Sequence, residues 1–379
     1  MRIRLDFFGK FEVQQHLPSL ESKKRAVLFR VYSCPAMSDS FFSTFSAARD
    51  LPTSWDKACA GGKDNEGNPF LCKASLRLLE QVNPTGQRYY LLEKEDRVSL
   101  FMTYQHRLDI LTYGFGSLRL LVTILGIPCS VSWPGLQIQE QDLEPFKQTL
   151  EKIPGALLIL NGQEPPLPLS PSCTRGLTLP NCELDIRGLY FAAYLKKMRS
   201  HYRYKLRSSL KRFQGIKAKV IENKSDFDSR LYQLYEQVYE RSDFKLEKLP
   251  ISFFQQFPAT ISVFSAGDKL LGFTQTMLSE KQQIKEQIFL FGGLDYELNQ
   301  QFHTYINMLL HVVRSGMEQG AERVNLGQTA EDVKTRLGCT LHRRFLYARH
   351  SNPFIHFLIR RGISLLSYSA PLTERHVFQ

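Results

Sequence analysis

The chain has 379 residues, of which 43% are hydrophobic, including 27 phenylalanines and 16 tyrosines. This length and composition exclude a disordered chain and exceed one ordinary core, so two folded domains are expected. Lysine and arginine outnumber aspartate and glutamate 49 to 37, a net charge of +12. That charge either favours anionic partners (nucleic acid, a nucleotide cofactor or an acidic membrane surface) or mainly confers solubility.

The cysteines and the first residues of the chain give information on the cellular compartment of the protein. Seven cysteines are scattered without a C-x-x-C pair, so neither a disulfide framework nor a zinc site is expected. The segment after Met1 lacks the apolar core of a signal peptide. The most apolar run, 118–127, contains Arg119 and is far shorter than the roughly 20 residues that span a bilayer. A cytoplasmic protein without a transmembrane segment is predicted.

The first half mixes strands and helices. Apolar periodicity and turn residues predict strands at 26–32, 88–92, 98–105 and 156–160, β structure within 108–131, helices at 38–48, 71–81 and 143–152, and a loop at 50–68. Five prolines, at 165, 166, 168, 171 and 180, then make 161–181 an exposed connector between domains.

A basic amphipathic helix is predicted over 190–214. Its apolar residues recur three or four apart. Ten lysines and arginines and no acid lie between 196 and 219. The residues chosen as candidates to track phosphates of tRNA, CoA or lipid headgroups are Arg199, Arg203, Lys205 and Arg207. The alternative is an ordinary solvated face.

The second half repeats the pattern of the first. Strands are predicted at 217–222, 260–265, 270–278 and 284–291, with helices at 227–241, 251–257 and 302–319 and a bulge at Gly292–Gly293. The stretch 323–347 is predicted as strand, turn at Gly327, short helix with Thr329 as N-cap, stop at Gly338, and strand. Each half thus gives strand, two helices, three strands, helix, strand, which suggests an internal duplication.

This order in the second half is that of the GNAT acyltransferase fold. Three motifs resemble the FemAB-type branch of tandem-GNAT proteins, which includes peptidoglycan-bridge aminoacyltransferases and acetyltransferases of the cellulose-biosynthesis type. They are YRYKLRSSLKR at 202–212, GMEQGA at 316–321, and LGQT at 326–329 leading to KTRLG at 334–338. The resemblance covers residues 183–350, and 25–160 by element order only. It implies an α/β fold with two tandem GNAT-like domains, each a mixed sheet flanked by helices.

One junction departs from that family. The usual GNAT pyrophosphate loop, [Arg/Gln]-x-x-Gly-x-[Gly/Ala], precedes the long helix, where free amides bind phosphate. Here residues 294–301 read LDYELNQQ, which is acidic and lacks glycine. The resemblance therefore implies acyl-CoA or aminoacyl-tRNA as the donor, and CoA is disfavoured in the usual place. No metal motif occurs.

N-acyl transfer needs an amine nucleophile, donors for the oxyanion and an acid for the leaving group. Gly292 and Gly293 are candidates to expose backbone amides to the oxyanion or pantetheine, the alternative being a plain sheet irregularity. Asp295 and Glu297 are candidate bases, and Tyr305 is a candidate acid. The alternatives are charge pairing at a helix N-terminus and a core tyrosine.

Three more residues are substrate-binding candidates. Gln328 lies at a strand end, a position that open sheets use for ligands. Lys334 and Arg336 lie on the short helix and are candidates to hold phosphate or carboxylate. The alternative for both cations is a solvated helix face.

These observations predict a first GNAT-like domain at 1–160, a connector at 161–181, a second domain at 182–350, and a C-terminal amphipathic helix and tail at 351–379. The expected function is transfer of an acyl or aminoacyl group to a small-molecule or peptide amine. The alternative is a non-catalytic scaffold that binds RNA, including tRNA, or an anionic membrane. The helix at 353–368 either docks on such a membrane, making the protein membrane-peripheral, or packs on the second domain.

Overall fold

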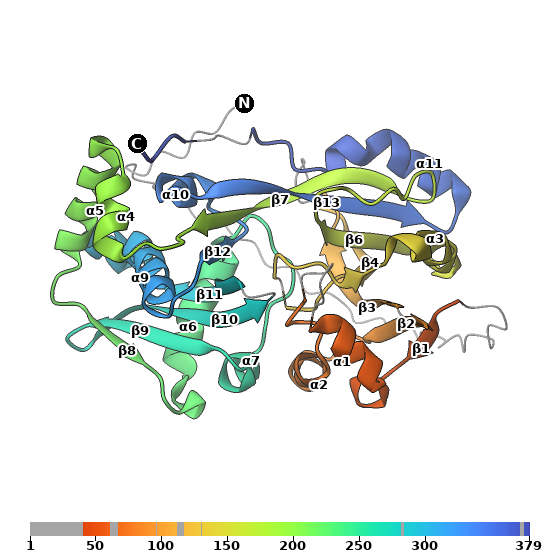
Figure 1. Cartoon of the computed structure of the whole chain (residues 1–379), viewed down its shortest axis with the longest axis horizontal. Helices are drawn as coiled ribbons and strands as arrows, with labels where there is room; N and C mark the ends of the chain where they lie inside the picture. Colours follow the sequence, from red (N-terminus) through yellow and green to blue (C-terminus); the bar gives the residue numbers. More distant parts are fainter. Residues whose placement is uncertain are drawn as a thin grey trace, which may run out of the picture. The chain divides into compact units, whose positions relative to one another are not determined.

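The computed structural model describes residues 41–60, 67–95, 97–111, 117–129, 131–281, 284–371 and 375–379. The strand predicted at 26–32 and the start of the helix predicted at 38–48 lie outside these residues. Figure 1 labels the helices and strands of the described part. Every helix within it is too short or too polar to cross a membrane.

One mixed sheet of thirteen strands runs through both halves of the chain (Figure 1). The first half contributes β1 (Ser43–Phe45), β2 (Arg88–Lys94), β3 (Arg97–Asp109), β4 (Arg119–Leu125), β5 (Leu136–Gln137), β6 (Ala156–Gly162) and β7 (Thr174–Asp185). The second half contributes β8 (Lys217–Val220), β9 (Thr260–Ala266), β10 (Lys269–Lys281), β11 (Ile284–Leu294), β12 (Arg323–Gly327) and β13 (Thr340–His350).

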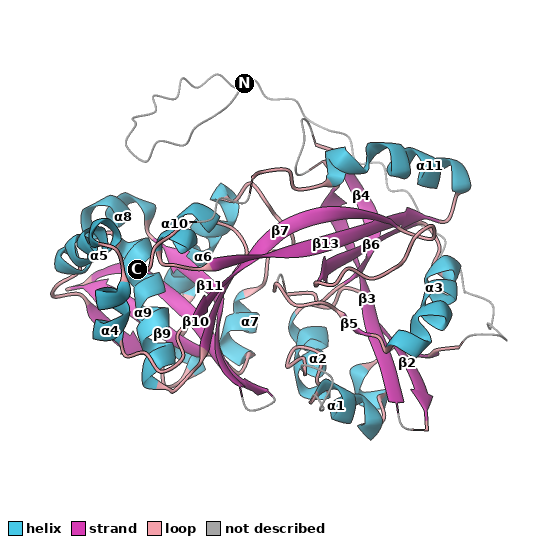
Figure 2. Cartoon of the chain, turned by 45° about the horizontal axis from the view of Figure 1, so that its top comes forward, coloured by secondary structure: helices cyan, strands magenta, loops and turns pink. Residues whose placement is uncertain are grey.

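Helices flank the sheet (Figure 2). Those of the first half are α1 (Thr53–Cys59), α2 (Lys73–Val82) and α3 (Leu143–Lys152). Those that follow are α4 (Phe191–Lys197), α5 (Ser200–Arg212), α6 (Ser229–Arg241), α7 (Ile251–Gln256), α8 (Tyr296–Phe302), α9 (Thr304–Glu318), α10 (Glu331–Arg336) and α11 (Pro353–Gly362), which continues into the 3₁₀ turn η4 (Ile363–Leu366).

The strand order shows how the two halves are joined. It runs β1-β2-β3-β4-β6-β13-β7-β12-β11-β10-β9-β8, with β5 paired to β3 off this path. Each half is an antiparallel meander followed by a parallel pair, β4 with β6 and β11 with β12. The last strand of each half is exchanged, because β7 pairs with β12 and β13 pairs with β6. Both halves have the order strand, two helices, three strands, helix and strand, but in the first half the first strand and the first helix are β1 and α1 and not the segments predicted.

Consecutive residues of β11 point to opposite faces of the sheet. A Cβ atom on Gly293 would lie 2.7 Å from the Cβ of Leu234 in α6, whereas one on Gly292 would lie 3.3 Å from the Cε of Met308 in α9. Helix α6 therefore covers one face of this strand and α9 the other. The α6 face belongs to an aromatic-rich core, and α9 packs on apolar residues of β7 and β12.

Several sequence predictions are wrong in detail. Residues 43–45 form β1 instead of helix, because they pair with β2 at the sheet edge. The loop predicted at 50–68 contains α1, since Trp55 and Cys59 lie one turn apart and are both buried. In the connector predicted at 161–181, residues from Thr174 onward are the strand β7. The domain boundary itself stays a prediction.

The basic helix predicted at 190–214 is two helices, α4 and α5. The break lies at Met198, which forms an isolated β-bridge with Phe378. The Arg199 amide donates to the carbonyl of Val377 at 2.9 Å. The C-terminal residues thus pair with the chain where the helix would otherwise continue.

Candidate functional site

The strands β11 and β12 part in the second half of the sheet. Their parallel pairing covers only Glu286–Ile288 against Arg323–Asn325. Beyond it, β11 continues along β10 to Leu294, while β12 ends at Gly327, which pairs with Cys182 of β7. Ligands of open α/β sheets bind at such diverging strand ends. The part of β11 beyond Ile288 is therefore the natural edge of a site.

Two backbone amides of β11 face this divergence. The Asp295 amide donates to the Leu271 carbonyl of β10 at 2.9 Å. Because amides alternate along an antiparallel strand, the amides of Leu294 and Gly292 point away from β10, toward the side of β12. The register from 291 to 294 is uninterrupted, so the alternation holds there. Either amide is placed to donate to an oxyanion or an amide-containing carrier.

The bulge predicted at Gly292–Gly293 lies elsewhere. The register shifts between Gln275 and Thr276 of β10, opposite Leu290, and both glycines remain in the strand. Glycine is needed at 293 because a Cβ atom there would approach the ring of Phe273 to 2.3 Å. The two glycines therefore mark close packing against neighbours, with Gly292 also lying on the diverging edge.

The start of the long helix α9 is capped by the chain itself. The Asn299 side chain accepts a hydrogen bond from the Tyr305 amide at 2.9 Å. His303 lies between α8 and α9 in the left-handed region, and its Nδ1 is 2.9 Å from the Ser209 hydroxyl of α5. Burial, followed by the nearby Arg212, lowers the pKa of His303. The Tyr305 amide at the start of α9 is thus already bonded to Asn299.

Tyr305 and Lys334 belong to one cluster where β12 ends and α10 begins. Burial raises the pKa of the Tyr305 hydroxyl, and Cys182 and Tyr296 add to this effect. Tyr305 therefore remains protonated at neutral pH and can donate a proton or a hydrogen bond. Cys182 and Cys339 lie near both Tyr305 and Lys334, so two thiols connect the two predicted residues.

Lys334 is not on a solvated helix face. Its side chain is 1% exposed, and Nζ donates to the Gln328 carbonyl at 2.6 Å. Burial lowers the pKa of Lys334, and burial raises the pKa of Cys182 to about 11. The ammonium holds the β12–α10 turn, where Thr329 has a φ of 64°.

The predicted N-cap is wrong for the same turn. The cap position is Ala330, which is also left-handed, and no side chain caps α10. Two consecutive residues at positive φ are needed to reverse the chain between Gly327 and α10, and this excludes the extended backbone that a threonine N-cap requires. The carbonyl of Gln328 is turned toward Lys334 as a result.

Gln328 joins this site to the first half of the chain. Its Nε2 donates to Leu179 O of β7 at 2.6 Å and to Asn161 Oδ1 of β6 at 3.1 Å. Arg336 points elsewhere: its guanidinium lies 2.5 Å from Asp332 and is about half exposed. The structure thus groups Gln328, Lys334 and Tyr305 and leaves Arg336 outside.

The two candidate bases differ in how far they are engaged. Oδ1 of Asp295 caps α8 by accepting the amides of Glu297 and Leu298 at 2.9 and 3.0 Å. Glu297 is exposed in the first turn of α8. The cap fixes Asp295 directly after the β11 edge, whereas Glu297 faces solvent.

The basic surface of α4 and α5 is exposed for most of its length. Arg203 is an exception, since its Nη1 donates to the carbonyls of Lys196 and Met198 at 2.9 and 3.1 Å. Arg199 Nε is 3.3 Å from the Phe378 carbonyl. Lys205 and Arg207 are exposed on α5. These last two are the members of the predicted set best placed to contact phosphates.

Sequence reasoning missed a charged network on the face of β12 opposite α9. Arg323 Nε lies 2.9 Å from Glu286 and 3.6 Å from Glu183, and Arg344 lies 3.4 Å from Glu183. Glu286 and Arg344 are almost fully buried. The sequence signal for this network is that charged residues alternate with apolar residues inside the strands. The network connects β11, β12, β7 and β13 beside the divergence.

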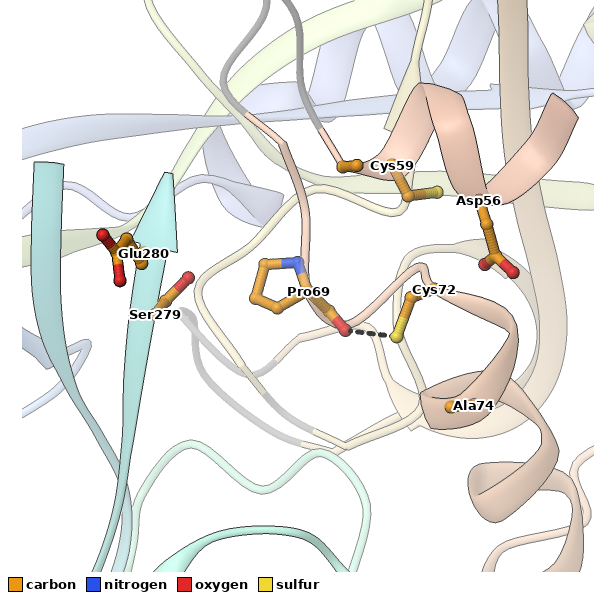
Figure 3. Close-up of a pocket in the computed structure, with 8 residues that line it drawn as sticks. Asp56, Cys59, Pro69, Cys72, Ala74, Ser279 and Glu280 are labelled. Atoms are coloured by element: carbon orange, nitrogen blue, oxygen red, sulfur yellow. Dashed lines mark hydrogen bonds between the residues drawn. The ribbon is translucent and has the colours of Figure 1, made fainter. Parts of the chain in front are cut away.

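A separate pocket of about 300 Å³ lies between the first half and the end of β10 (Figure 3). Its polar groups are largely bonded to the chain: Cys72 Sγ donates to Pro69 O at 3.1 Å, and Asp56 accepts the Lys73 amide at 2.8 Å. It contains none of the predicted site residues. The described residues also hold no group of three or more side chains suited to a metal, and no disulfide joins their cysteines.

The fold of the described residues is similar to that of FemX. The chain superposes on the FemX structure with a TM-score of 0.54 and 10% identity, over 84% of this chain and 100% of that one. Weaker matches include a tandem GNAT protein from the clavulanic acid biosynthesis pathway (TM-score 0.47, 11% identity, 82% and 98% covered) and L-PGS from Bacillus licheniformis (0.43, 13%, 74% and 87%). No protein-family model and no curated protein sequence matches. The predicted fold class and resemblance are confirmed.

Proposed function

We propose that the chain transfers an acyl or aminoacyl group from an activated carrier, an acyl-CoA or an aminoacyl-tRNA, to an amine. The observation that carries the proposal is the divergence of β11 from β12 in a FemX-like fold, with the Gly292 and Leu294 amides on one side and Tyr305 nearby in the α9 core. The site combines amide donors, a protonated phenol and carboxylates, which are the groups that acyl transfer requires.

In this proposal the acceptor amine attacks the carbonyl carbon of the thioester or ester. The Gly292 or Leu294 amide donates to the oxygen of the tetrahedral intermediate. The C–O or C–S bond then breaks. A leaving alkoxide takes the Tyr305 proton, whereas a leaving thiolate accepts a hydrogen bond from Tyr305 and receives its proton from the acid form of Asp295 or Glu297. Asp295 or Glu297 accepts the proton that the amine loses. Lys334 and Gln328 hold the β12–α10 turn beside the donor.

The capped start of α9 favours aminoacyl-tRNA over CoA as the carrier. The Asn299 cap occupies the Tyr305 amide at the start of α9. The exposed Lys205 and Arg207, with Arg199 and Arg203 behind them, offer a surface for tRNA phosphates instead. The acceptor is a small molecule or a peptide with a free amine, and the protein acts in the cytoplasm, in part at the membrane surface.

Ligand-induced stabilisation tests the carrier first. The purified protein is melted with acetyl-CoA, longer acyl-CoAs and aminoacylated bulk tRNA, at low and high salt. A ligand present at 100 times its dissociation constant stabilises by about 2.7 kcal/mol. For a folded unit of this size that corresponds to roughly 4 °C in melting temperature. No shift with any carrier would overturn the proposal.

Tyr305→Phe tests the chemistry with the carrier that binds. Loss of the acid should lower the rate of transfer to amine acceptors by about 10²- to 10⁴-fold while carrier binding is kept. Arg336→Ala is the matched control, because Arg336 is exposed and paired with Asp332. It should retain both the rate of transfer and the affinity for the substrate. An unchanged rate in Tyr305→Phe would remove this residue from the reaction.

The exposed basic surface also favours a second candidate function, a non-catalytic RNA-binding scaffold. In that case Lys205→Gln with Arg207→Gln would weaken tRNA binding. The slope of the logarithm of the binding constant against the logarithm of the salt concentration would become less steep by roughly 0.7 to 0.9 per lost phosphate contact. If the protein is a non-catalytic scaffold, no acyl group is transferred from the bound aminoacyl-tRNA to any amine that is supplied. Transfer from the bound tRNA would exclude it.

A further inference from the structure

Helix α11 and the turn η4 carry large apolar side chains on the molecular surface. Phe354 is 68% exposed, Leu365 62%, Leu358 50% and Phe357 48%. At about 100° per residue, Phe354, Phe357 and Leu358 share one side of the helix with Arg361. His356, Ile359 and Ile363 lie on the other side and are half-buried. The more apolar side of this amphipathic helix therefore faces outward.

Contacts at both ends of the segment fix this orientation. At the start, Asn352 Oδ1 accepts the Phe354 and Ile355 amides at 2.9 and 3.2 Å. At the end, the Tyr368 amide donates to Leu177 O of β7 at 2.8 Å. A Cβ on Gly176 would lie 3.3 Å from Ile363, so the turn packs closely on β7. The helix cannot simply roll over to bury its phenylalanines.

The charged residues within this segment of the sequence are of one sign. No aspartate or glutamate occurs between Asp332 and Glu374. Arg360 and Arg361 are exposed on α11 itself, and the Arg361 guanidinium carbon lies 5.1 Å from the centre of the Phe357 ring. Phenylalanines flanked by arginines match the interface of an anionic bilayer, where rings enter the headgroup region and arginines meet phosphates.

A second copy of the chain is a poorer occupant of the same surface. A ten-residue helix is about 15 Å long and 10 Å wide, so a contact through it buries only a few hundred Å² in total, against the roughly 1,200 Å² of a stable interface. A two-fold symmetric contact would also bring Arg360 and Arg361 of both copies together.

We propose that the α11–η4 surface, defined by Phe354, Phe357, Leu358, Leu365, Arg360 and Arg361, docks the protein on anionic lipid. Phe354 and Phe357 enter the headgroup layer, and the two arginines bind lipid phosphates. The proposal is independent of the acyl-transfer reaction, because none of these residues belongs to the site at β11 and β12. It would hold the protein at a membrane surface whatever its acceptor.

Vesicle flotation with the full chain tests it. The vesicles are phosphatidylcholine with and without about one-third phosphatidylglycerol, at low and high salt. We expect binding to the anionic vesicles that weakens with salt. Phe354→Ser with Phe357→Ser should reduce it at least about tenfold, and Arg360→Gln with Arg361→Gln about thirtyfold. Leu121→Ser is the matched control, since Leu121 is 58% exposed on β4; it should bind as the parent does.

Four outcomes would overturn the proposal. The first is that the parent protein does not bind the anionic vesicles. The second is that Leu121→Ser loses as much vesicle binding as the phenylalanine variant. The third is that light scattering shows a dimer of the parent, which becomes a monomer in the phenylalanine variant. The fourth is a melting temperature several degrees lower in the phenylalanine variant, which would show that another segment of the chain covers the surface. A variant that melts like the parent but leaves the vesicles supports docking.

Discussion

Replacing Lys334 by alanine and by methionine separates two parts of its contribution to stability. The side chain is 1% exposed, and Nζ donates to Gln328 O at 2.6 Å. Alanine removes three buried methylenes, about 0.8 kcal/mol each, and leaves that carbonyl without the ammonium, at a cost of about 1–3 kcal/mol. Methionine keeps the apolar volume and loses only the hydrogen bond. The alanine variant should therefore be less stable than the methionine variant by about 2.4 kcal/mol.

The same pair of variants predicts a pH dependence. Burial lowers the pKa of Lys334 in the folded state. Between that pKa and the unfolded value near 10.4, the unfolded chain binds more protons than the folded one, so the free energy of unfolding rises with pH. Below the folded pKa the cost of the buried charge is fully present. The Lys334→Met variant lacks this group and therefore lacks this rise.

Urea unfolding followed by circular dichroism, at pH values from about 7 to about 10, measures both effects. Arg336→Ala is the control, because its exposed pair with Asp332 is worth about 0.5 kcal/mol. Equal destabilisation by alanine and methionine would refute the buried position of Lys334. Parallel pH curves for the parent and Lys334→Met would refute the lowered pKa.

Two further predictions concern packing and acid stability. Gly293→Ala should lower the free energy of unfolding in urea by about 1–3 kcal/mol, because its Cβ would lie 2.3 Å from the Phe273 ring. Gly362→Ala is the control: a Cβ there would have no neighbour within 4 Å, and the free energy of unfolding should change by less than about 1 kcal/mol. Burial lowers the pKa of His311, so the unfolded chain binds more protons below about pH 6.5 and stability falls as the pH drops through that range. His311→Gln should melt with a shallower pH dependence there, and an identical profile would contradict this assignment.

Elements whose signals are local could be predicted from the sequence. The helix at 143–152 was expected from apolar spacing alone, and the structure has the same bounds. The loop predicted at 50–68 failed because α1 buries only Trp55 and Cys59 in an otherwise polar stretch. The long basic helix failed for a non-local reason, since Val377 and Phe378 pair with the chain at its break. No sequence pattern within residues 190–214 predicts that contact.

The site was predictable in its residues more than in their arrangement. Gln328, Lys334 and Tyr305 were chosen for their positions on elements, and the structure gathers them around the end of β12. Cys182 was passed over because its place beside Lys334 depends on the exchange of β7 into the second half of the sheet. The burial of Lys334 could not be predicted either, because lysine is rarely buried and the neighbouring sequence gives no sign that this one is.

The two halves share a topology but differ where it matters for ligand binding. In the first half β4 ends at Leu125, which still pairs with Ile159 of β6, so this parallel pair does not diverge within the described residues. Beside it, the buried carboxylate of Asp142 precedes α3 and accepts from Ser99 at 2.8 Å. In the second half β11 runs six residues past its last pair with β12, from Ile288 to Leu294. Of the two parallel pairs, β11–β12 diverges and exposes strand amides, whereas β4–β6 does not within the described residues. Donor binding is therefore expected in the second half, while the first half supports the turn at Gln328 through Asn161.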